Sequence, residues 1–279
     1  MNNKALVATK TASIVALKKT RNLLEITDEI LTDRAVRSSE DSWIKQLWHW
    51  ADKNGIPDYH YIQRGGTQHW EGFPRNKKTL LTITELHLID CGLKYIPDSI
   101  GNLEQLTCLD LHKNVITYLP ESIGNLTRLN FLDLGWNELS SVPDSLGNLF
   151  CLTELVLSEN KITNIPESIS NLTELDVLLC RDNRLTDLPE SIGNLTNLHV
   201  LDCDENRLKR LPDSIGKLTR LLFLSCTDNE LLKLPDSLTN LTQLDYFQFD
   251  GDKIQLSTKQ HKWLELLSKK GCSIWMRPK

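Results

Sequence analysis

Leucine, isoleucine and valine recur at fixed intervals along most of the chain, and polar residues fill the positions between them. After Pro120, for example, the apolar positions are Ile123, Leu126, Leu129, Leu132, Leu134, Leu139 and Val142. The prolines that begin the copies are spaced 23 residues apart, at Pro74, Pro97, Pro120, Pro143, Pro166, Pro189, Pro212 and Pro235. Each copy has too little apolar surface to fold alone, so the pattern predicts a solenoid whose stacked turns share one core.

Each copy contains a short alternating segment that predicts a strand. In "LHVLDCDEN", Leu201 and Cys203 alternate with Val200, Asp202 and Asp204. A strand sends successive side chains to opposite faces, so the first pair is expected to point inward and the other three outward.

One asparagine follows each of these strands, at Asn114, Asn137, Asn160, Asn183, Asn206 and Asn229. We expect an inward amide here to bond backbone groups that the bend of the chain leaves unpaired. Cys91 and Asp252 replace the asparagine in the first and last turns, so the ladder is expected to end there.

The segment "LPESIGNL" predicts a short helical turn on the side of each copy opposite the strand. Proline at the first position of a short helical turn loses no needed N–H, and the acidic residue after it favours the positive helix end.

The combined pattern L-x-x-L-x-L-x-x-N-x-L, repeated about eight times over residues 73–256, resembles the leucine-rich repeat family. The "LPESIGNL" wording is similar to the plant intracellular Ras-group and to bacterial LPxSIGNL-type repeats. The resemblance implies an α/β solenoid, a horseshoe with a parallel sheet on its concave side. The narrower resemblance also implies, more distantly, binding of a Ras-type GTPase.

Helical caps are expected at both ends, because an uncapped terminal turn would expose its leucines. Residues 41–72 are interpreted as a helical cap, carrying Trp43, Leu47 and Trp50 at helical spacing, followed by a loop. Residues 257–279 predict a C-terminal helical cap over Phe247 and Phe249. Residues 1–40 predict a weakly amphipathic helical arm that either packs on the tryptophan helix or stays detached.

Charge is distributed unevenly along the chain. Residues 1–40 hold seven Lys/Arg against five acids, and residues 253–279 hold seven against one, so the total of −5 leaves −13 for residues 41–252. An acidic middle argues against nucleic acid as a partner, because phosphate binding requires basic stripes. Seven cysteines without framework spacing, and no secretory signal, predict a reducing, cytoplasmic location without a transmembrane segment.

The outward strand positions are the candidate recognition surface, because they vary freely within a strict frame. Large apolar side chains there have no core to serve, and acids lie beside them, which is typical of an interface with an apolar centre and a charged rim. The candidate residues are Phe131, Asp133, Trp136, Val156, Val177, Leu179, Arg181, Val200, Asp202, Asp204, Phe223 and Tyr246. Mutual packing of some of these side chains is the alternative.

The sequence argues against a catalytic site and against a metal site. His87, Cys108, Asp110, His112 and Asp133 converge in the first turns, but the repeat itself makes them neighbours and no residue supplies an oxyanion hole or an obvious fourth ligand. We therefore expect no catalytic residue, no metal and no cofactor. Cys180, Cys203 and Cys226 are interpreted as small buried hydrophobes.

The sequence thus predicts a non-enzymatic module that recognises a protein on its concave face, with a preference for a basic or mixed apolar and basic surface. The alternative is a bacterial effector or signalling adaptor in which the N-terminal helices act and the repeats target it.

Overall fold

The computed structural model describes residues 41–64 and 67–277. The chain divides into two compact units, Met1–His49 and Trp50–Lys279, and the boundary falls within helix α2 (Ser42–Lys53). The helical arm predicted for residues 1–40 lies outside the described residues.

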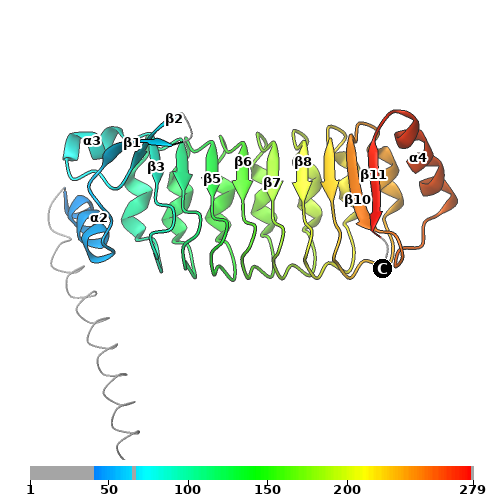
Figure 1. The fold of residues 1–279 in the computed structure, drawn as a ribbon, viewed down its shortest axis with the longest axis horizontal. Coiled ribbons are helices and arrows are strands. Elements are labelled where there is room, and N and C mark those ends of the chain that lie inside the picture. Colours follow the sequence, from blue (N-terminus) through cyan, green and yellow to red (C-terminus); the bar gives the residue numbers. More distant parts are fainter. Residues whose placement is uncertain (1–40, 65–66, 278–279) are drawn as a thin grey trace, which may run out of the picture. The chain divides into compact units, whose positions relative to one another are not determined.

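One parallel sheet runs along the second unit (Figure 1). Its nine strands follow chain order, each paired in register with the next: β3 (Glu85–His87), β4 (Cys108–Asp110), β5 (Phe131–Asp133), β6 (Glu154–Val156), β7 (Val177–Leu179), β8 (Val200–Asp202), β9 (Phe223–Ser225), β10 (Tyr246–Asp250) and β11 (Ser273–Arg277). The sheet is open. The predicted α/β solenoid with a parallel sheet is therefore confirmed.

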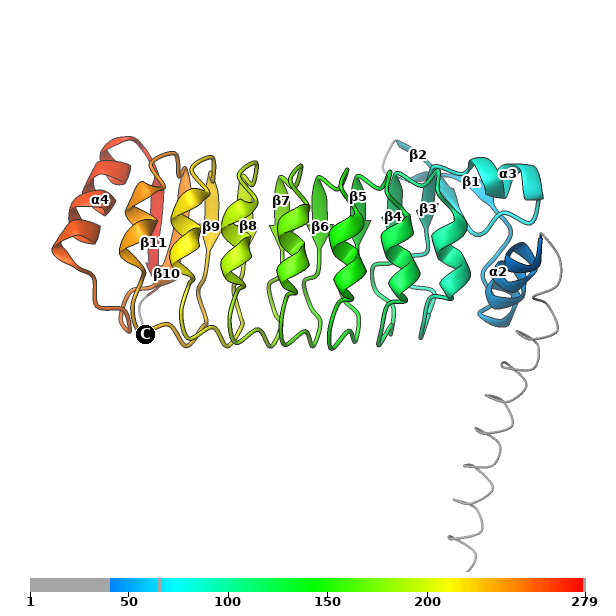
Figure 2. The ribbon, with the colours of Figure 1, turned by 180° about the vertical axis from the view of Figure 1, so that it is seen from behind.

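The opposite side of the coil is built from short 3-10 helices that lie side by side (Figure 2). They are η1 (Asp98–Asn102), η2 (Glu121–Asn125), η3 (Asp144–Asn148), η4 (Glu167–Asn171), η5 (Glu190–Asn194), η6 (Asp213–Lys217) and η7 (Asp236–Asn240). Each begins with Asp or Glu, as predicted. The repeat proline occupies the N-cap and not the first helical position, because its ψ near 150° is extended, as at Pro120.

The core fills the space between the sheet and the 3-10 helices. Leu132 and Leu134 point into it from β5 and the residue after it, Ile123 and Leu126 close it from η2, and all four are fully buried. At about 25 cal/mol per Å² of apolar surface removed from water, such a leucine spine supplies the main stabilisation of the coil.

Glycine in the 3-10 helices lets adjacent turns approach closely. A Cβ on Gly124 would lie 2.3 Å from the carbonyl oxygen of Ser145 in the next turn, and the same clash recurs at Gly147. Ser170 and Thr239 occupy the equivalent positions of two other turns. The glycine is thus a requirement of turn spacing wherever the neighbouring backbone comes this near.

The N-terminal part of the described chain contains more structure than the sequence predicted. The helix expected around Trp43–Trp50 is α2, which ends at Lys53. Gly55, two residues later, has a left-handed backbone conformation with φ of 64°. The loop predicted after it is wrong, since β1 (His60–Arg64) and β2 (Thr67–Glu71) form an antiparallel hairpin, followed by helix α3 (Lys77–Thr82). The pair Gly65 and Gly66 between two β-prone segments is a hairpin signal.

Within the second unit, the last turn of α2 packs on the beginning of the coil. The Trp50 ring meets the Phe73 ring edge-on, with 5.9 Å between centroids, and Trp50 Nε1 donates to the Tyr95 carbonyl. Both Trp50 and Ala51 are buried. These residues cover the N-terminal end of the leucine core, as a cap requires.

The C-terminal cap is helix α4 (Thr258–Lys269), with Ser257 as its N-cap in a reciprocal capping box with Gln260. Trp263 lies against Phe247, with 5.4 Å between ring centroids, so the predicted covering of Phe247 is confirmed. Strand β11 after α4 was not predicted, although Ile274 and Met276 alternate with Ser273 and Trp275 there.

Candidate functional site

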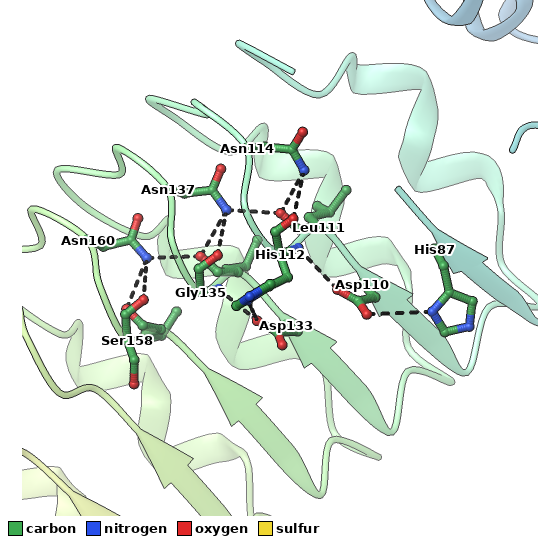
Figure 3. A network of polar contacts seen from close by, with 12 residues as sticks. His87, Asp110, Leu111, His112, Asn114, Asp133, Gly135, Asn137, Ser158 and Asn160 are labelled. Atoms are coloured by element: carbon green, nitrogen blue, oxygen red, sulfur yellow. Dashed lines mark hydrogen bonds and ion pairs between the residues drawn. The ribbon is translucent and has the colours of Figure 1, made fainter. Parts of the chain in front are cut away.

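A ladder of buried asparagines holds the bend at which each strand leaves the sheet (Figure 3). The Asn137 side chain accepts the Ile116 N–H at 3.0 Å and donates to the carbonyls of Leu111 and Leu134, also at 3.0 Å each. One side chain thus joins its own turn to the preceding turn. The predicted inward role of these asparagines is confirmed.

The asparagine ladder runs from Asn114 to Asn229. At the first turn, the side-chain oxygen of Asn114 accepts the backbone N–H groups of both Cys91 and Leu93. At the other end, the Asp250 carboxylate accepts the amides of Asp228 and Asn229 at 3.3 and 3.4 Å. Asp250, at the end of β10, thus accepts two amides whose counterparts in an earlier turn, those of Asp182 and Asn183, bond to backbone carbonyls of the following turn.

The residue before each asparagine, and the one before Cys91 in the first turn, adopts a left-handed backbone with φ between 51° and 58°, although none is glycine. These residues are Asp90, Lys113, Trp136, Glu159, Asp182, Glu205 and Asp228. The ladder holds this uncommon conformation. Trp136, 53 % exposed with Lys113 Nζ 6.0 Å from its ring centroid, is the large aromatic member of this row.

We define the sheet face as the outward side of strands β3–β10. Its first column is Glu85, Cys108, Phe131, Glu154, Val177, Val200, Phe223 and Tyr246, and its second is His87, Asp110, Asp133, Val156, Leu179, Asp202, Ser225 and Gln248. The middle residue of each three-residue strand from β3 to β9 is fully buried, for example Leu132, while Phe131 and Leu179 stay partly exposed. The predicted register is confirmed.

Apolar side chains gather on the sheet face between β5 and β10. Val156 and Leu179 are paired neighbours in the second column, as are Val177 and Val200 in the first. The Phe223 and Tyr246 rings stack with 4.7 Å between centroids and 2° between planes. Mutual packing, which was the alternative for these positions, therefore accounts for part of the burial of Phe223 and Tyr246. Both side chains remain partly exposed.

Carboxylates border this apolar group. Burial, with the nearby charge of Asp204, raises the pKa of Asp202 to about 6. Arg181 is bound to Glu205 and lies near Asp202, but it does not offset that shift. A cation brought to Asp202 by a ligand would stabilise a carboxylate that the protein itself leaves poorly compensated.

Asp204 does not lie open on the sheet face. It is 6 % exposed, and its carboxylate accepts the Ser225 hydroxyl at 2.7 Å and the Thr227 amide at 2.6 Å. The sequence placed Asp204 among partner-facing residues because of its outward strand parity. The next turn covers it through small polar side chains, so its role is to join two turns.

Histidines and aspartates form a network across the first turns (Figure 3). His87 Nδ1 lies 3.6 Å from an Asp110 carboxylate oxygen, and His112 Nδ1 lies 3.7 Å from Asp133. The hydrogen-bonding interaction with Asp110 raises the pKa of His87, although burial opposes it. Asp110 and Asp133 also accept the backbone amides of His112 and Gly135, so these carboxylates brace the bend.

The geometry offers little for catalysis here. Burial raises the pKa of Cys108 to about 12, which keeps the thiol protonated and weakly nucleophilic. In the described part of the chain, no group of three or more His, Cys, Asp or Glu side chains is arranged to hold a metal ion. Within the same residues, no helix has the length and apolar character needed to cross a membrane.

Sequence reasoning missed one residue of this surface. Trp275 of β11 pairs with Gln248 in register and so continues the second column beyond β10; it is 47 % exposed. The available signal was the alternation in "SIWMR" after Gly271.

Comparisons with known proteins agree with this architecture. The family model for the leucine-rich repeat region matches residues 75–182 and 178–269. No match was found among curated proteins.

Several solved structures are similar to the chain. An internalin from Listeria monocytogenes is 23 % identical over 71 % of this chain and 56 % of its own, with a TM-score of 0.61. The plant peptide hormone receptor RGFR1, in complex with RGF2, is 32 % identical over 70 % of this chain and 32 % of its own, with a TM-score of 0.62.

The ectodomain of the Arabidopsis thaliana receptor kinase GASSHO1/SCHENGEN3, in complex with CASPARIAN STRIP INTEGRITY FACTOR 2, is 31 % identical, with a TM-score of 0.61. It matches over 70 % of this chain and 24 % of its own. The chain therefore spans 56 % or less of these three proteins. The family match, the parallel sheet and the asparagine ladder together place this chain in the leucine-rich repeat family.

Proposed function

We propose that this chain is a non-enzymatic interaction module whose sheet face, the concave side in solenoids of this kind, binds a protein partner. The observation that carries the proposal is the apolar group on that face. Phe131, Val156, Val177, Leu179 and Val200 are partly exposed on strands whose other side already fills the core. An apolar group of this kind beside carboxylates is typical of a recognition surface.

Similar proteins support this use of the fold. Two of the similar structures are plant receptors captured in complex with a second molecule, RGF2 in one and CASPARIAN STRIP INTEGRITY FACTOR 2 in the other. Leucine-rich repeats present extended surfaces because their turns stack along one axis.

The partner that fits this surface carries a basic or mixed apolar and basic patch. Asp202 is partly buried without a full counter-charge, and Asp133 and Glu154 likewise have pKa values raised mainly by burial. A lysine or arginine of the partner would relieve this cost, whereas a nucleic-acid phosphate would increase it.

We propose a reducing compartment such as the cytoplasm for this module. All seven cysteines are free thiols, and Cys180, Cys203 and Cys226 are buried in one inward column. Unpaired cysteines are typical of chains that stay in a reducing environment.

Affinity capture with substituted full-length protein tests the proposal. Replacing Phe131, Leu179 and Phe223 together by alanine should remove the captured partner while the thermal unfolding midpoint changes little. The matched control replaces Tyr118, Phe150 and Leu232, which are exposed apolar residues outside the sheet face. Deleting residues 1–40 should leave capture of the partner intact. If this deletion abolishes capture and the alanine variant does not, the proposal is contradicted and action by the N-terminal segment is favoured.

A further inference from the structure

The last strand of the sheet has an open edge. Strand β11 pairs with β10 on one side only, and among residues 41–64 and 67–277 no strand pairs with its other side. Ser273 donates its amide to Asp245 of the preceding turn at 2.8 Å. Because backbone direction alternates along a strand, the N–H and C=O groups of Ile274 and Met276 point to the open edge.

The side chains of Ile274, Trp275 and Met276 in β11 are also less covered than those of their partners in β10. Met276 pairs in register with Phe249 and Ile274 with Phe247, which are core positions. Both phenylalanines are fully buried, whereas Met276 is 52 % exposed and Ile274 is partly exposed. On the sheet face, Trp275 is 47 % exposed. An edge with open backbone groups and apolar side chains on both faces is a template for an added strand.

The charge of this end of the molecule selects the occupant. Residues 253–277 contain six Lys/Arg and the single acid Glu265, and three of the lysines, Lys259, Lys262 and Lys269, lie on α4. A second copy would bring the same positive charge to the edge, and basic side chains near an edge strand oppose self-pairing. An acidic chain would be attracted to it.

We propose that the open edge of β11 binds an extended acidic segment of a partner protein as a tenth strand of the sheet. The added strand receives and donates hydrogen bonds at Ile274 and Met276. Its apolar residues cover Met276 on one face and Trp275 on the other, and its carboxylates face the lysines of the C-terminal segment. This site adjoins the end of the sheet face at Trp275 and differs from the sheet face in the charge of its ligand.

Two probes test the site on the full-length protein. The first is a fluorescent synthetic peptide that alternates glutamate and valine; the second has lysine in place of glutamate. We expect the acidic peptide to bind, with affinity that falls as salt rises, and to slow hydrogen exchange at the amides of Ile274 and Met276. The basic peptide, and an acidic peptide with methylated backbone nitrogens, should not bind.

A matched pair of variants separates backbone pairing from side-chain contact. Met276→Pro removes one edge-facing N–H, which an edge strand tolerates, and should weaken peptide binding about tenfold or more. Met276→Val keeps the N–H and should retain binding. Both should unfold at the wild-type temperature.

Three results would overturn the proposal. The first is binding of the acidic peptide without protection of the Ile274 and Met276 amides. The second is protection of these amides from hydrogen exchange without peptide. Protection in a concentration-dependent dimer would make a second copy the occupant of the edge. Protection in the monomer would mean that another part of the chain itself covers the edge. The third is equal binding of both peptides.

Discussion

The side-chain oxygen of Asn137 accepts the backbone N–H of Ile116, which lies in the preceding turn, at 3.0 Å. The same relationship joins Asn160 to Leu139 and Asn183 to Ile162. Each asparagine therefore pairs with a buried amide that no backbone carbonyl of its own turn reaches. These contacts fix the bends along the asparagine ladder. The position of each bend in turn determines which side chains of the neighbouring strand face solvent.

Replacing Asn137 by alanine should lower the free energy of unfolding by about 3 kcal/mol, because one buried amide and three buried carbonyls lose a partner. Urea denaturation followed by circular dichroism measures the change. The control is Asn130→Ala on the exposed side of the same turn, where about 0.5 kcal/mol or less is expected. Equal losses in the two variants would show that the ladder does not stabilise the coil.

Replacing Gly147 by alanine should lower the free energy of unfolding by roughly 1–3 kcal/mol, because the new Cβ would lie 2.4 Å from the Ser168 carbonyl oxygen. The matched control is Ser170→Ala, since Ser170 already carries a Cβ at the equivalent position of the next turn. That variant should unfold like the wild type. A neutral Gly147→Ala would mean that the turns can separate without cost.

The buried cysteine column should be chemically silent in the folded protein. Burial raises the pKa of Cys180, Cys203 and Cys226 well above that of an ordinary thiol. We expect a thiol reagent to label exposed Cys151 at once and these three only at the rate of unfolding. Cys151→Ser should remove the fast phase. Fast labelling of Cys203 in the native protein would contradict the inward register.

Stability should depend on pH through Asp202. Its pKa is raised to about 6 in the folded protein, so between about pH 4 and pH 6 the folded state holds a proton that the unfolded state releases. The penalty is absent below this window and complete above it. Asp202→Asn, which keeps the oxygen that accepts the Asp204 amide, should therefore gain stability relative to the wild type as pH rises from 4 to 7.

The gain should reach roughly 1–2 kcal/mol once solvent screening is allowed for. Urea denaturation at several pH values measures it. Exposed Asp245→Asn serves as the control and should show no such trend. A stability difference that does not change with pH would place the Asp202 carboxylate in a well-solvated environment.

The sequence was sufficient for the repeated part of the fold, because each of its features recurs at a 23-residue spacing. Leu132 and Asn137 could be assigned inward positions because the same offsets are apolar or amide in turn after turn. The non-repeated ends of the chain could be predicted less completely. The hairpin of β1 and β2 and the strand β11 occur once, so only local propensity could indicate them.

Burial on the sheet face was the other limit. Strand parity assigns Asp204 an outward direction, but parity does not reveal that Ser225 and Thr227 of the next turn close over it. Coverage of an outward side chain depends on its neighbours in adjacent turns. For the same reason, the sequence could offer the stacking of Phe223 on Tyr246 only as an alternative.

The central claim, that the sheet face is the surface that meets the partner, is tested most directly by site-specific photo-crosslinking. A photoreactive amino acid is placed at Leu179 on the sheet face in one variant and at Leu232, an exposed position outside it, in another. The account predicts a crosslinked partner from position 179 and none from position 232. Crosslinking from position 232 alone would contradict it.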